Sequence, residues 1–377
     1  MEHSIQQLLR QYNDQLALSE ASTIPASWYS ESRIMELERR AVFGANWQCA
    51  GRMDQVAQPG QYIAMEVAGE PVVVVRGADS KLRGFFNVCR HHAAAVAAAP
   101  CGSVQIFRCP YHGWSYGLDG SLKGTPDFAG VCNFDRAQNG LVPIAVDTWE
   151  QFVFVSLEAP RQSLSEYLGE AVKQLVPLDI SALHFFESRT YTLNCNWKVF
   201  VDNYLDGGYH VPYLHKGLNS VLDYAEYTIE SGERFCLQSS PMSSSQEDAQ
   251  VAATRTGDRA YYYWIYPNFM INIYQGVMDT NLVIPMGIDK TKVIFHFYFA
   301  DISLEKQKQN AESVAVGDRI QMEDLGICEA VQRGLSSRAY QAGRLSVRRE
   351  AGEHLFHRLL AKDLKGPGDS IANGESR

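Results

Sequence analysis

Short apolar runs separated by turn residues fill the chain from Asn46 to about Pro160. Alternating apolar and polar positions are typical of half-buried β-strands, and clusters of Gly, Asp and Ser between such runs indicate hairpin turns. The pattern predicts strands at 61–67, 71–76, 82–88, 104–108, 141–146 and 152–157. We therefore expect a small antiparallel β domain over residues 46–160.

Helical spacing of apolar residues precedes and follows this β domain. Residues 5–18 and, after a break at Pro25, residues 34–43 each place their apolar side chains on one helical face. A helix at 163–175 is expected to mark the boundary to a second domain, residues 161–377. We expect the N-terminal helices, within residues 1–45, to pack on that second domain.

The second domain combines strands with long helices. Its predicted strands are 183–193, 224–230, 234–238, 260–266, 269–274, 281–285 and 292–300, and its predicted helices are 196–206 and 318–335. A sheet backed by long helices is an α+β arrangement. The fold class expected for the whole chain is therefore α+β.

Composition narrows the possible functions. The chain has 377 residues, 46% hydrophobic and 20% charged, which is enough for two domains with full cores. Its net charge of −9 and scattered Lys and Arg residues argue against a nucleic-acid partner. No apolar run approaches the roughly 20 residues of a membrane span, and the N-terminus lacks a leader pattern. We expect a cytoplasmic protein, or a protein of the chloroplast stroma if the chain is a trimmed form.

Two loops of the β domain carry residues that bind metals. Cys89 and His91 form a Cys-x-His pair, and Cys109 and His112 form a Cys-x-x-His pair about twenty residues later. In a Rieske [2Fe–2S] centre, two thiolates hold one iron and two imidazoles hold the other. The alternative is a zinc site with two Cys and two His ligands. A second group of possible metal ligands lies further along the chain. It favours the iron–sulfur cluster over zinc, because a metal bound there could accept the electrons that the cluster passes on.

The other cysteines do not indicate a disulfide framework. Eight cysteines are widely spaced over a chain of this length, and most outside the two loops lie in apolar surroundings. Cys101 lies between the two loops. It is expected either to pack as a small apolar side chain or to cover the cluster.

The second group of possible metal ligands comprises His210, His215 and a carboxylate. Two histidines and one carboxylate on one side of an iron(II) leave three positions open, the facial triad of non-haem oxygenases. Asp324, in the predicted helix 318–335, is our choice for the carboxylate, with Glu323 and Glu329 as alternatives on the same helix. Taken alone, the two histidines could simply be buried and hydrogen-bonded, but beside a Rieske motif iron is the better interpretation.

Together these motifs resemble the α-subunit of Rieske non-haem iron oxygenases. The resemblance extends from about Trp47 to Leu360 and is carried by the two cluster loops, by Asn196-Trp197-Lys198, and by Asp202-Asn203 leading to His210 and His215. Within that family, residues 202–215, 261–274 and 321–334 are similar to the choline monooxygenases. The resemblance implies a Rieske domain followed by a catalytic domain with a curved antiparallel sheet and covering helices, of the helix-grip type.

The resemblance also implies cofactors, assembly and further site residues. It implies a [2Fe–2S] cluster, an Fe(II) ion and a homotrimer in which electrons pass from the cluster of one subunit to the iron of its neighbour. Many members carry an acidic residue three positions before the first histidine ligand, but this chain has Gly207 there. Asp206 is the nearest replacement for orienting the imidazole, with Asp202 as a weaker candidate. Asn203 and Asp206 are thus the expected catalytic residues.

The absence of a nicotinamide-binding motif indicates that another protein supplies the electrons. The aromatic residues indicate the class of substrate. The chain has no dinucleotide loop, P-loop or nucleophile elbow, so a separate reductase or ferredoxin is expected to deliver its electrons. A quaternary ammonium ion is recognised mainly by aromatic faces. Tyr266, Phe269 and Tyr274 are the predicted substrate residues, although aromatic side chains in strands also fill cores.

The predicted reaction is the O₂-dependent hydroxylation of choline to betaine aldehyde hydrate. The first alternative is oxidative N-demethylation of another quaternary amine, such as glycine betaine, carnitine or proline betaine. The second is an electron-transfer or sensing Rieske protein without oxygenase activity. Release of formaldehyde would distinguish the first alternative, and full function without His210 would indicate the second.

Overall fold

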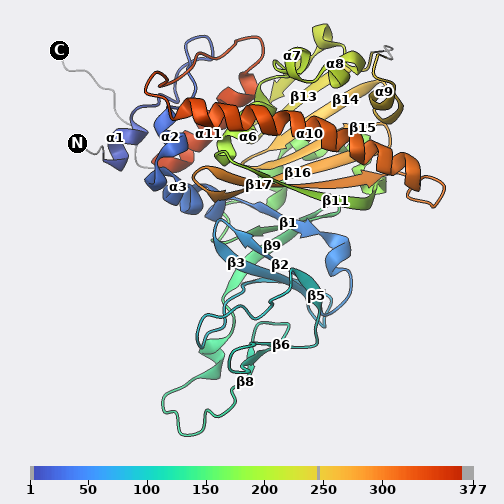
Figure 1. Ribbon diagram of the computed structural model, residues 1–377. Helices are drawn as coiled ribbons and strands as arrows, with labels where there is room; N and C mark the ends of the chain where they lie inside the picture. The colour runs from blue at the N-terminus through green and yellow to red at the C-terminus, as the bar shows by residue number, and fades with distance from the viewer. Residues whose placement is uncertain (1–3, 244–246, 367–377) are drawn as a thin grey trace. The chain divides into compact units, whose positions relative to one another are not determined.

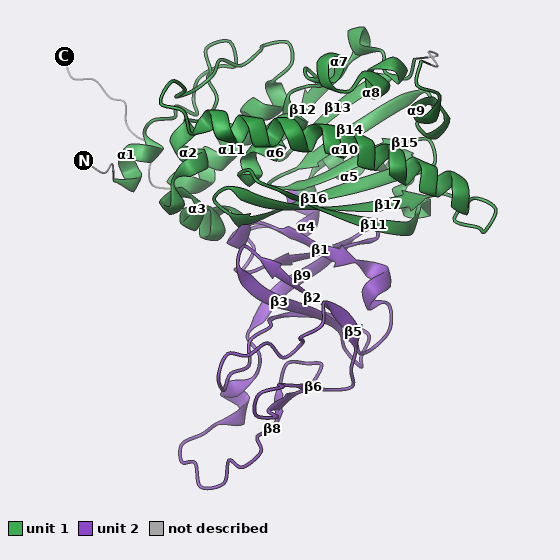
Figure 2. Cartoon of the chain, viewed as in Figure 1, with its two compact units in different colours: residues 1–42, 168–377 green, residues 43–167 purple. Residues whose placement is uncertain are grey.

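The computed structural model describes residues 4–243 and 247–366, and the chain divides into two compact units. Residues 43–167 form one unit, and residues 1–42 together with 168–377 form the other (Figure 2). An antiparallel sheet lies at the centre of each unit, which confirms the predicted α+β class. Within the described residues, no helix has the length and apolar character needed to cross a membrane.

The smaller unit contains a seven-stranded and a three-stranded antiparallel sheet. The strand order is β1-β10-β9-β4-β3-β2-β5 in the first sheet and β6-β7-β8 in the second. The strands are β1 (Gln48–Arg52), β2 (Gln61–Val67), β3 (Glu70–Arg76), β4 (Leu82–Phe86), β5 (Cys101–Ser103), β6 (Phe107–Arg108), β7 (Ser115–Tyr116), β8 (Leu122–Gly124), β9 (Pro143–Trp149) and β10 (Phe152–Ser156). In β3 the four valines from Val72 to Val75 are all buried, so this strand is apolar on both faces.

The predicted strand at 104–108 is largely wrong. Only its last two residues, in β6, are in a strand, and the preceding strand β5 pairs instead with β2 through Cys101 and Ile63. The side chain of Cys101 is exposed. The expectation that Cys101 packs in the core is therefore also wrong.

The larger unit is built on a seven-stranded antiparallel sheet with the order β11-β17-β16-β15-β14-β13-β12. Its strands are β11 (His184–Leu193), β12 (Thr228–Ser231), β13 (Phe235–Pro241), β14 (Arg259–Ile265), β15 (Phe269–Tyr274), β16 (Val277–Gly287) and β17 (Lys290–Phe299). The predicted strand at 224–230 is shorter than expected, because Tyr224–Glu226 form a 3-10 turn. Each remaining predicted strand overlaps one of these elements.

Helices cover one face of this sheet, and Figure 1 shows the long helix α10 lying across it. The helices of this unit are α1 (Ile5–Leu9), α2 (Ala26–Ser30), α3 (Ser32–Glu38), α5 (Glu170–Leu175), α6 (Trp197–Leu205), α7 (Val211–Leu214), α8 (Lys216–Val221), α9 (Ala249–Thr254), α10 (Gln307–Leu335) and α11 (Ala351–Lys365). Helix α6 contacts α10, α11 and strand β16. It therefore lies between the sheet and the two long helices.

Three helix predictions differ from the structure. The first helix ends at Leu9, so Leu16 and Leu18 lie in turns instead of on its face. The helix expected at 163–175 is divided into α4 (Leu164–Leu168) and α5 by Gly169, whose φ of 53° no helix accommodates. Helix α10 begins at Gln307 instead of Asp318. It is followed by helix α11, which was not predicted from the sequence.

Candidate functional site

In the smaller unit, the two predicted cluster loops come together. The rings of His91 and His112 lie 4.7 Å apart, and His91 stacks on Trp114 at the same centroid distance. Cys89 and Cys109 are buried in one cluster of side chains, and the Cys89 Sγ lies 3.2 Å from the Tyr116 hydroxyl. That hydroxyl also accepts a hydrogen bond from the Arg90 backbone N–H at 2.9 Å. Tyr116 thus connects the first loop to strand β7.

The donor atoms of these loops fit a two-iron cluster better than a single zinc ion. Nitrogen atoms of His91, His112 and the neighbouring His92 lie within 4.8 Å of one another, and in the described part of the chain neither thiol joins that group. A zinc ion would hold two thiolates and two imidazoles at about 2.0–2.3 Å from one point. The Nδ1 atom of His91 is buried and has no hydrogen-bond partner among the described residues. A metal ligand bond would satisfy this atom.

In the larger unit, His210, His215 and Asp324 converge. Their donor atoms lie within 4.8 Å of one another. The Nε2 atoms of His215 and His210 lie 3.0 and 3.9 Å from Asp324 Oδ1, and the two rings cross at a centroid distance of 4.9 Å. Asn203, predicted as a catalytic residue, donates a hydrogen bond from Nδ2 to the same Asp324 oxygen at 2.9 Å. The arrangement matches a facial triad with Asn203 orienting its carboxylate.

The backbone before His210 explains why the acidic residue stands at 206 and not at 207. Gly207 and Gly208 both have φ near 68°, and a Cβ on Gly207 would lie 2.0 Å from the Arg349 carbonyl oxygen. This left-handed turn returns the backbone N–H groups of Tyr209 and His210 to the Asp206 carboxylate, at 3.1 and 3.0 Å. The same carboxylate lies 2.6 Å from His210 Nδ1. Asp206 therefore orients this ring, whereas Asp202 faces elsewhere.

Glu323 orients the second ring. Its Oε2 lies 2.6 Å from His215 Nδ1, while Asp324 faces the Nε2 atom of the same ring. From the sequence, Glu323 was an alternative metal ligand or a salt-bridge partner, and its contact with His215 was not predicted. The other rival, Glu329, accepts hydrogen bonds from the backbone and side chain of Asn194. Glu323 and Asp324 thus face the two nitrogen atoms of His215, whereas Glu329 contacts Asn194.

We expect Glu323→Gln to weaken binding of the mononuclear iron by about 10–100-fold, because carboxylate partners raise the basicity of metal-bound imidazoles. A chelator titration that counts iron beyond the cluster measures this effect. Glu329→Gln, on the same helix, is the matched control and should bind iron as the wild type does. Equal iron affinities in the two variants would contradict the role assigned to Glu323.

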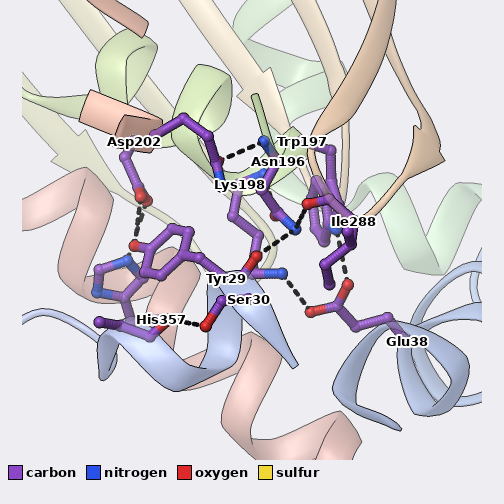
Figure 3. Close-up of polar contacts among 11 residues, drawn as sticks. Tyr29, Ser30, Glu38, Asn196, Trp197, Lys198, Asp202, Ile288 and His357 are labelled. Atoms are coloured by element: carbon purple, nitrogen blue, oxygen red, sulfur yellow. Dashed lines mark hydrogen bonds and ion pairs between the residues drawn. The ribbon is translucent and has the colours of Figure 1, made fainter. Parts of the chain in front are cut away.

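Buried polar contacts hold helix α6, which carries Asn203, in place (Figure 3). The Asn196 side chain caps the helix through the Lys198 N–H at 3.1 Å. Lys198 is fully buried, and its Nζ lies 2.6 Å from Glu38 Oε1, while Trp197 Nε1 donates to Glu38 Oε2 at 2.8 Å. Burial lowers the pKa of Lys198, and the Glu38 charge opposes that shift. These contacts fix α6 against helix α3.

At its other end, this network connects α6 to α2 and α11. Tyr29 donates a hydrogen bond to Asp202 Oδ2 at 2.5 Å, and His357 Nε2 lies 2.9 Å from Asp202 Oδ1. Figure 3 shows Tyr29 and His357 approaching Asp202 from below α6. Each Asp202 oxygen therefore has a polar partner, one from helix α2 and one from helix α11. This residue anchors the helix that positions the triad, and it does not contact the histidines of the triad.

A cavity opens onto the His210, His215 and Asp324 group. About 120 Å³ of it is open to the centres of water-sized molecules. Aromatic side chains contribute much of its lining: Phe200, Tyr204, Tyr227, Tyr262, Tyr274 and Phe295. Apart from Asp324, one acidic and one basic residue of the described chain, Asp279 and Arg255, also line it. The cavity is suited to a small organic molecule that presents a cation to aromatic faces.

Of the three predicted substrate residues, the structure brings only Tyr274 to this cavity. Phe269 lies in the same strand, but residues separated by an odd number of positions point to opposite faces of a sheet. Tyr266 follows the end of β14, is buried, and donates a hydrogen bond to Asp363 in α11 at 2.8 Å. Both residues fill the core, which was the other interpretation of these aromatic side chains.

Comparison with protein families assigns the two units to known domains. The smaller unit contains the match to the Rieske [2Fe-2S] domain, residues 46–135, and the larger unit contains the match to the ring hydroxylating alpha subunit (catalytic domain), residues 180–366. The chain belongs to the Rieske non-haem iron monooxygenases, which carry a [2Fe–2S] cluster and a mononuclear iron. The cofactors and the class of enzyme expected from the sequence are thereby confirmed.

Similar proteins include enzymes named for two quaternary amines. The chloroplastic choline monooxygenase of Arabidopsis thaliana is 40% identical over 96% of this chain and 87% of its own length. The carnitine monooxygenase oxygenase subunit of Escherichia coli is 31% identical over 92% of this chain and 95% of its own. Among solved structures, the quaternary ammonium Rieske monooxygenase CntA in complex with L-carnitine has a TM-score of 0.79 at 29% identity, covering 92% and 96% of the two chains.

Proposed function

We propose that this protein is the oxygenase component that hydroxylates choline to betaine aldehyde hydrate, with O₂ and electrons from a separate reductase or ferredoxin. The observation that carries the proposal is the aromatic cavity that opens onto the group of His210, His215 and Asp324. The identity to five choline monooxygenases, between 33% and 40%, supports this choice of substrate.

In this proposal, each cofactor has its own ligands. Cys89 and Cys109 hold one iron of the cluster, and His91 and His112 hold the other. His210, His215 and Asp324 hold the mononuclear Fe(II). The cluster supplies single electrons, and the mononuclear iron supplies the oxygen chemistry when it is bound. The chain is proposed to act as a homotrimer, with Asp206 next to the site where a neighbouring subunit's cluster would deliver its electron.

The side chains of the cavity have binding and orienting tasks. Choline, O₂, two electrons and two protons give the aldehyde hydrate and one water, so the carbon next to the hydroxyl must face the triad. Tyr227, Tyr262 and Tyr274 offer faces to the trimethylammonium group, each worth about 0.5–2 kcal/mol. Asn203 and Glu323 keep Asp324 and His215 in position. Burying the ammonium group among these rings excludes water from the reacting carbon.

A second candidate is N-demethylation of a quaternary amine that also carries a carboxylate, such as glycine betaine, carnitine or proline betaine. One observation favours it: the guanidinium of Arg255, a residue that is 4% exposed, lies at the cavity. Guanidinium groups bind carboxylates well, and choline has none. The carnitine monooxygenase relatives, at 30–31% identity, also support this candidate.

Product analysis distinguishes the two reactions. Enzyme supplied with a reductase and choline should consume oxygen and form betaine aldehyde without formaldehyde, because only the alcohol carbon is oxidised. Formaldehyde release from a carboxylate-bearing amine, with no oxygen uptake on choline, would overturn the choline proposal and support demethylation.

A further inference from the structure

A carboxylate is buried in the wall of the cavity at the centre of the large sheet. Asp279 lies in β16 opposite Asn272 in β15, and its side chain is 5% exposed. Burying an ionised carboxylate is costly unless charges or hydrogen bonds compensate it. The strand otherwise contains mainly apolar and neutral residues, so Asp279 calls for an explanation. None of the motifs in the sequence pointed to it.

A chain of hydrogen bonds holds this carboxylate in one orientation. The Tyr204 hydroxyl donates to Asn272 Oδ1 at 2.7 Å, which turns the amide nitrogen of Asn272 toward Asp279 Oδ2, also at 2.7 Å. Asn281 donates to the same Oδ2 at 3.4 Å. Among the described residues, the two amide hydrogen bonds to Asp279 both end on its Oδ2 atom. Both asparagine amides favour the ionised form of the acid.

The positive charge of Arg255 partly compensates the charge of Asp279. Its guanidinium lies over the Tyr274 ring at 5.0 Å and donates to Ser313 Oγ at 2.7 Å, and no ion pair joins it to Asp279 in the part of the chain that the structure describes. Burial raises the pKa of Asp279, whereas the Arg255 charge and the hydrogen bonds from Asn272 and Asn281 lower it. Burial is the largest of these effects, so the pKa of Asp279 is raised overall, and a cation placed in the cavity would favour the ionised form of this carboxyl group.

We propose that Asp279 is the counter-charge that selects a cationic substrate over a neutral molecule of the same shape. This inference rests on the proposed function. The aromatic faces of the cavity attract a cation only over a short range, and a quaternary ammonium cannot donate a hydrogen bond. A buried negative charge adds an attraction that acts on the ammonium group and not on a neutral tert-butyl group. Asp279 is the acidic residue that lines the cavity apart from Asp324 of the triad. It is thus the residue placed to make this distinction.

A purely structural role is the competing explanation. The hydrogen bonds of Asp279 also join β15 and β16 to helix α6 through Tyr204. A role limited to this connection predicts a less stable protein when the charge is removed, but no change in the preference between charged and neutral ligands. The ratio of two affinities therefore separates the two roles.

The test compares choline with its neutral isostere 3,3-dimethyl-1-butanol. Binding to the intact iron-loaded protein is measured by calorimetry without oxygen, so no turnover is needed. We expect the wild type to bind choline at least about tenfold more tightly than the isostere, and Asp279→Asn to lose most of that preference while its affinity for the isostere changes less than about twofold. Asp318→Asn, which removes an acidic residue of α10 outside the cavity lining, should keep the wild-type ratio.

Two results would overturn the proposal. One is a wild type that binds both ligands equally, which requires no variant and is decisive even if Asp279→Asn does not fold. The other is an Asp279→Asn protein that keeps the preference for choline. Oxygen uptake with choline tests the proposed function separately. An enzyme that oxidises choline yet binds the isostere equally well would support the proposed function and contradict the role of Asp279.

Discussion

His210→Ala should reduce substrate-dependent oxygen uptake by more than about a hundredfold while the protein keeps the visible spectrum of its [2Fe–2S] cluster. Even carboxylates that only support a metal ligand alter affinity or activity by 10–100-fold, and His210 is a proposed ligand. Its Nε2 faces Asp324, and its Nδ1 lies 2.6 Å from Asp206. The cluster ligands belong to the other compact unit of the chain, so the spectrum should not change.

An exposed histidine provides the control for this experiment. His184, at the start of β11, is exposed and belongs to neither group of histidines, so His184→Ala should retain wild-type oxygen uptake and iron content. If His210→Ala kept both its cluster spectrum and full function, the mononuclear iron would not be catalytic. The protein would then be better described as an electron-transfer or sensing Rieske protein.

Glu38→Ala should lower the free energy of unfolding by about 3–5 kcal/mol, because it leaves the Lys198 ammonium buried without its partner. Glu38 and Lys198 have side-chain exposures of 1% and 0%, and Trp197 would lose its hydrogen bond as well. Chemical unfolding followed by tryptophan fluorescence measures the change. Because helix α6 also carries Asn203, iron binding should weaken in the same variant.

An exposed ion pair is the comparison for this variant. Glu170 and Lys173 lie 2.7 Å apart, with side chains 58% and 75% exposed, so Glu170→Ala should cost no more than about 1 kcal/mol. Replacing both Glu38 and Lys198 with apolar residues should recover much of the loss. A loss below about 1 kcal/mol for Glu38→Ala would show that the buried pair does not anchor α6.

The metal-binding loops could be predicted from the sequence because their information is local. Cys89 and His91 are two positions apart, Cys109 and His112 three, and His210 and His215 five, so the short spacing within each pair, together with the presence of the other pairs, indicated metal centres. Asp324 lies 109 residues after His215 in the chain, and only its helix and its acidic character suggested it. The choice among neighbouring acids depends on which face of α10 meets the histidines, and that face is a tertiary property.

The lining of the cavity could be predicted only in part. Strand alternation correctly separates Tyr274 from Phe269 once the buried face is known, but the sequence does not state which face borders the site. Asp279 and Asn272 carried a usable signal, because polar side chains interrupt strands that are otherwise apolar. The sequence also contained a signal for helix α11, because Phe356, Leu360 and Leu364 lie four residues apart and all are buried.

Iron and sulfide counting on anaerobically purified protein tests the central claim most directly. Two different iron centres in one chain, a two-iron cluster and a single iron, predict about three irons and two sulfides per chain. We expect that ratio, together with oxygen uptake when a quaternary amine and a reductase are added. Colourless protein that holds only zinc, without sulfide, would contradict the account.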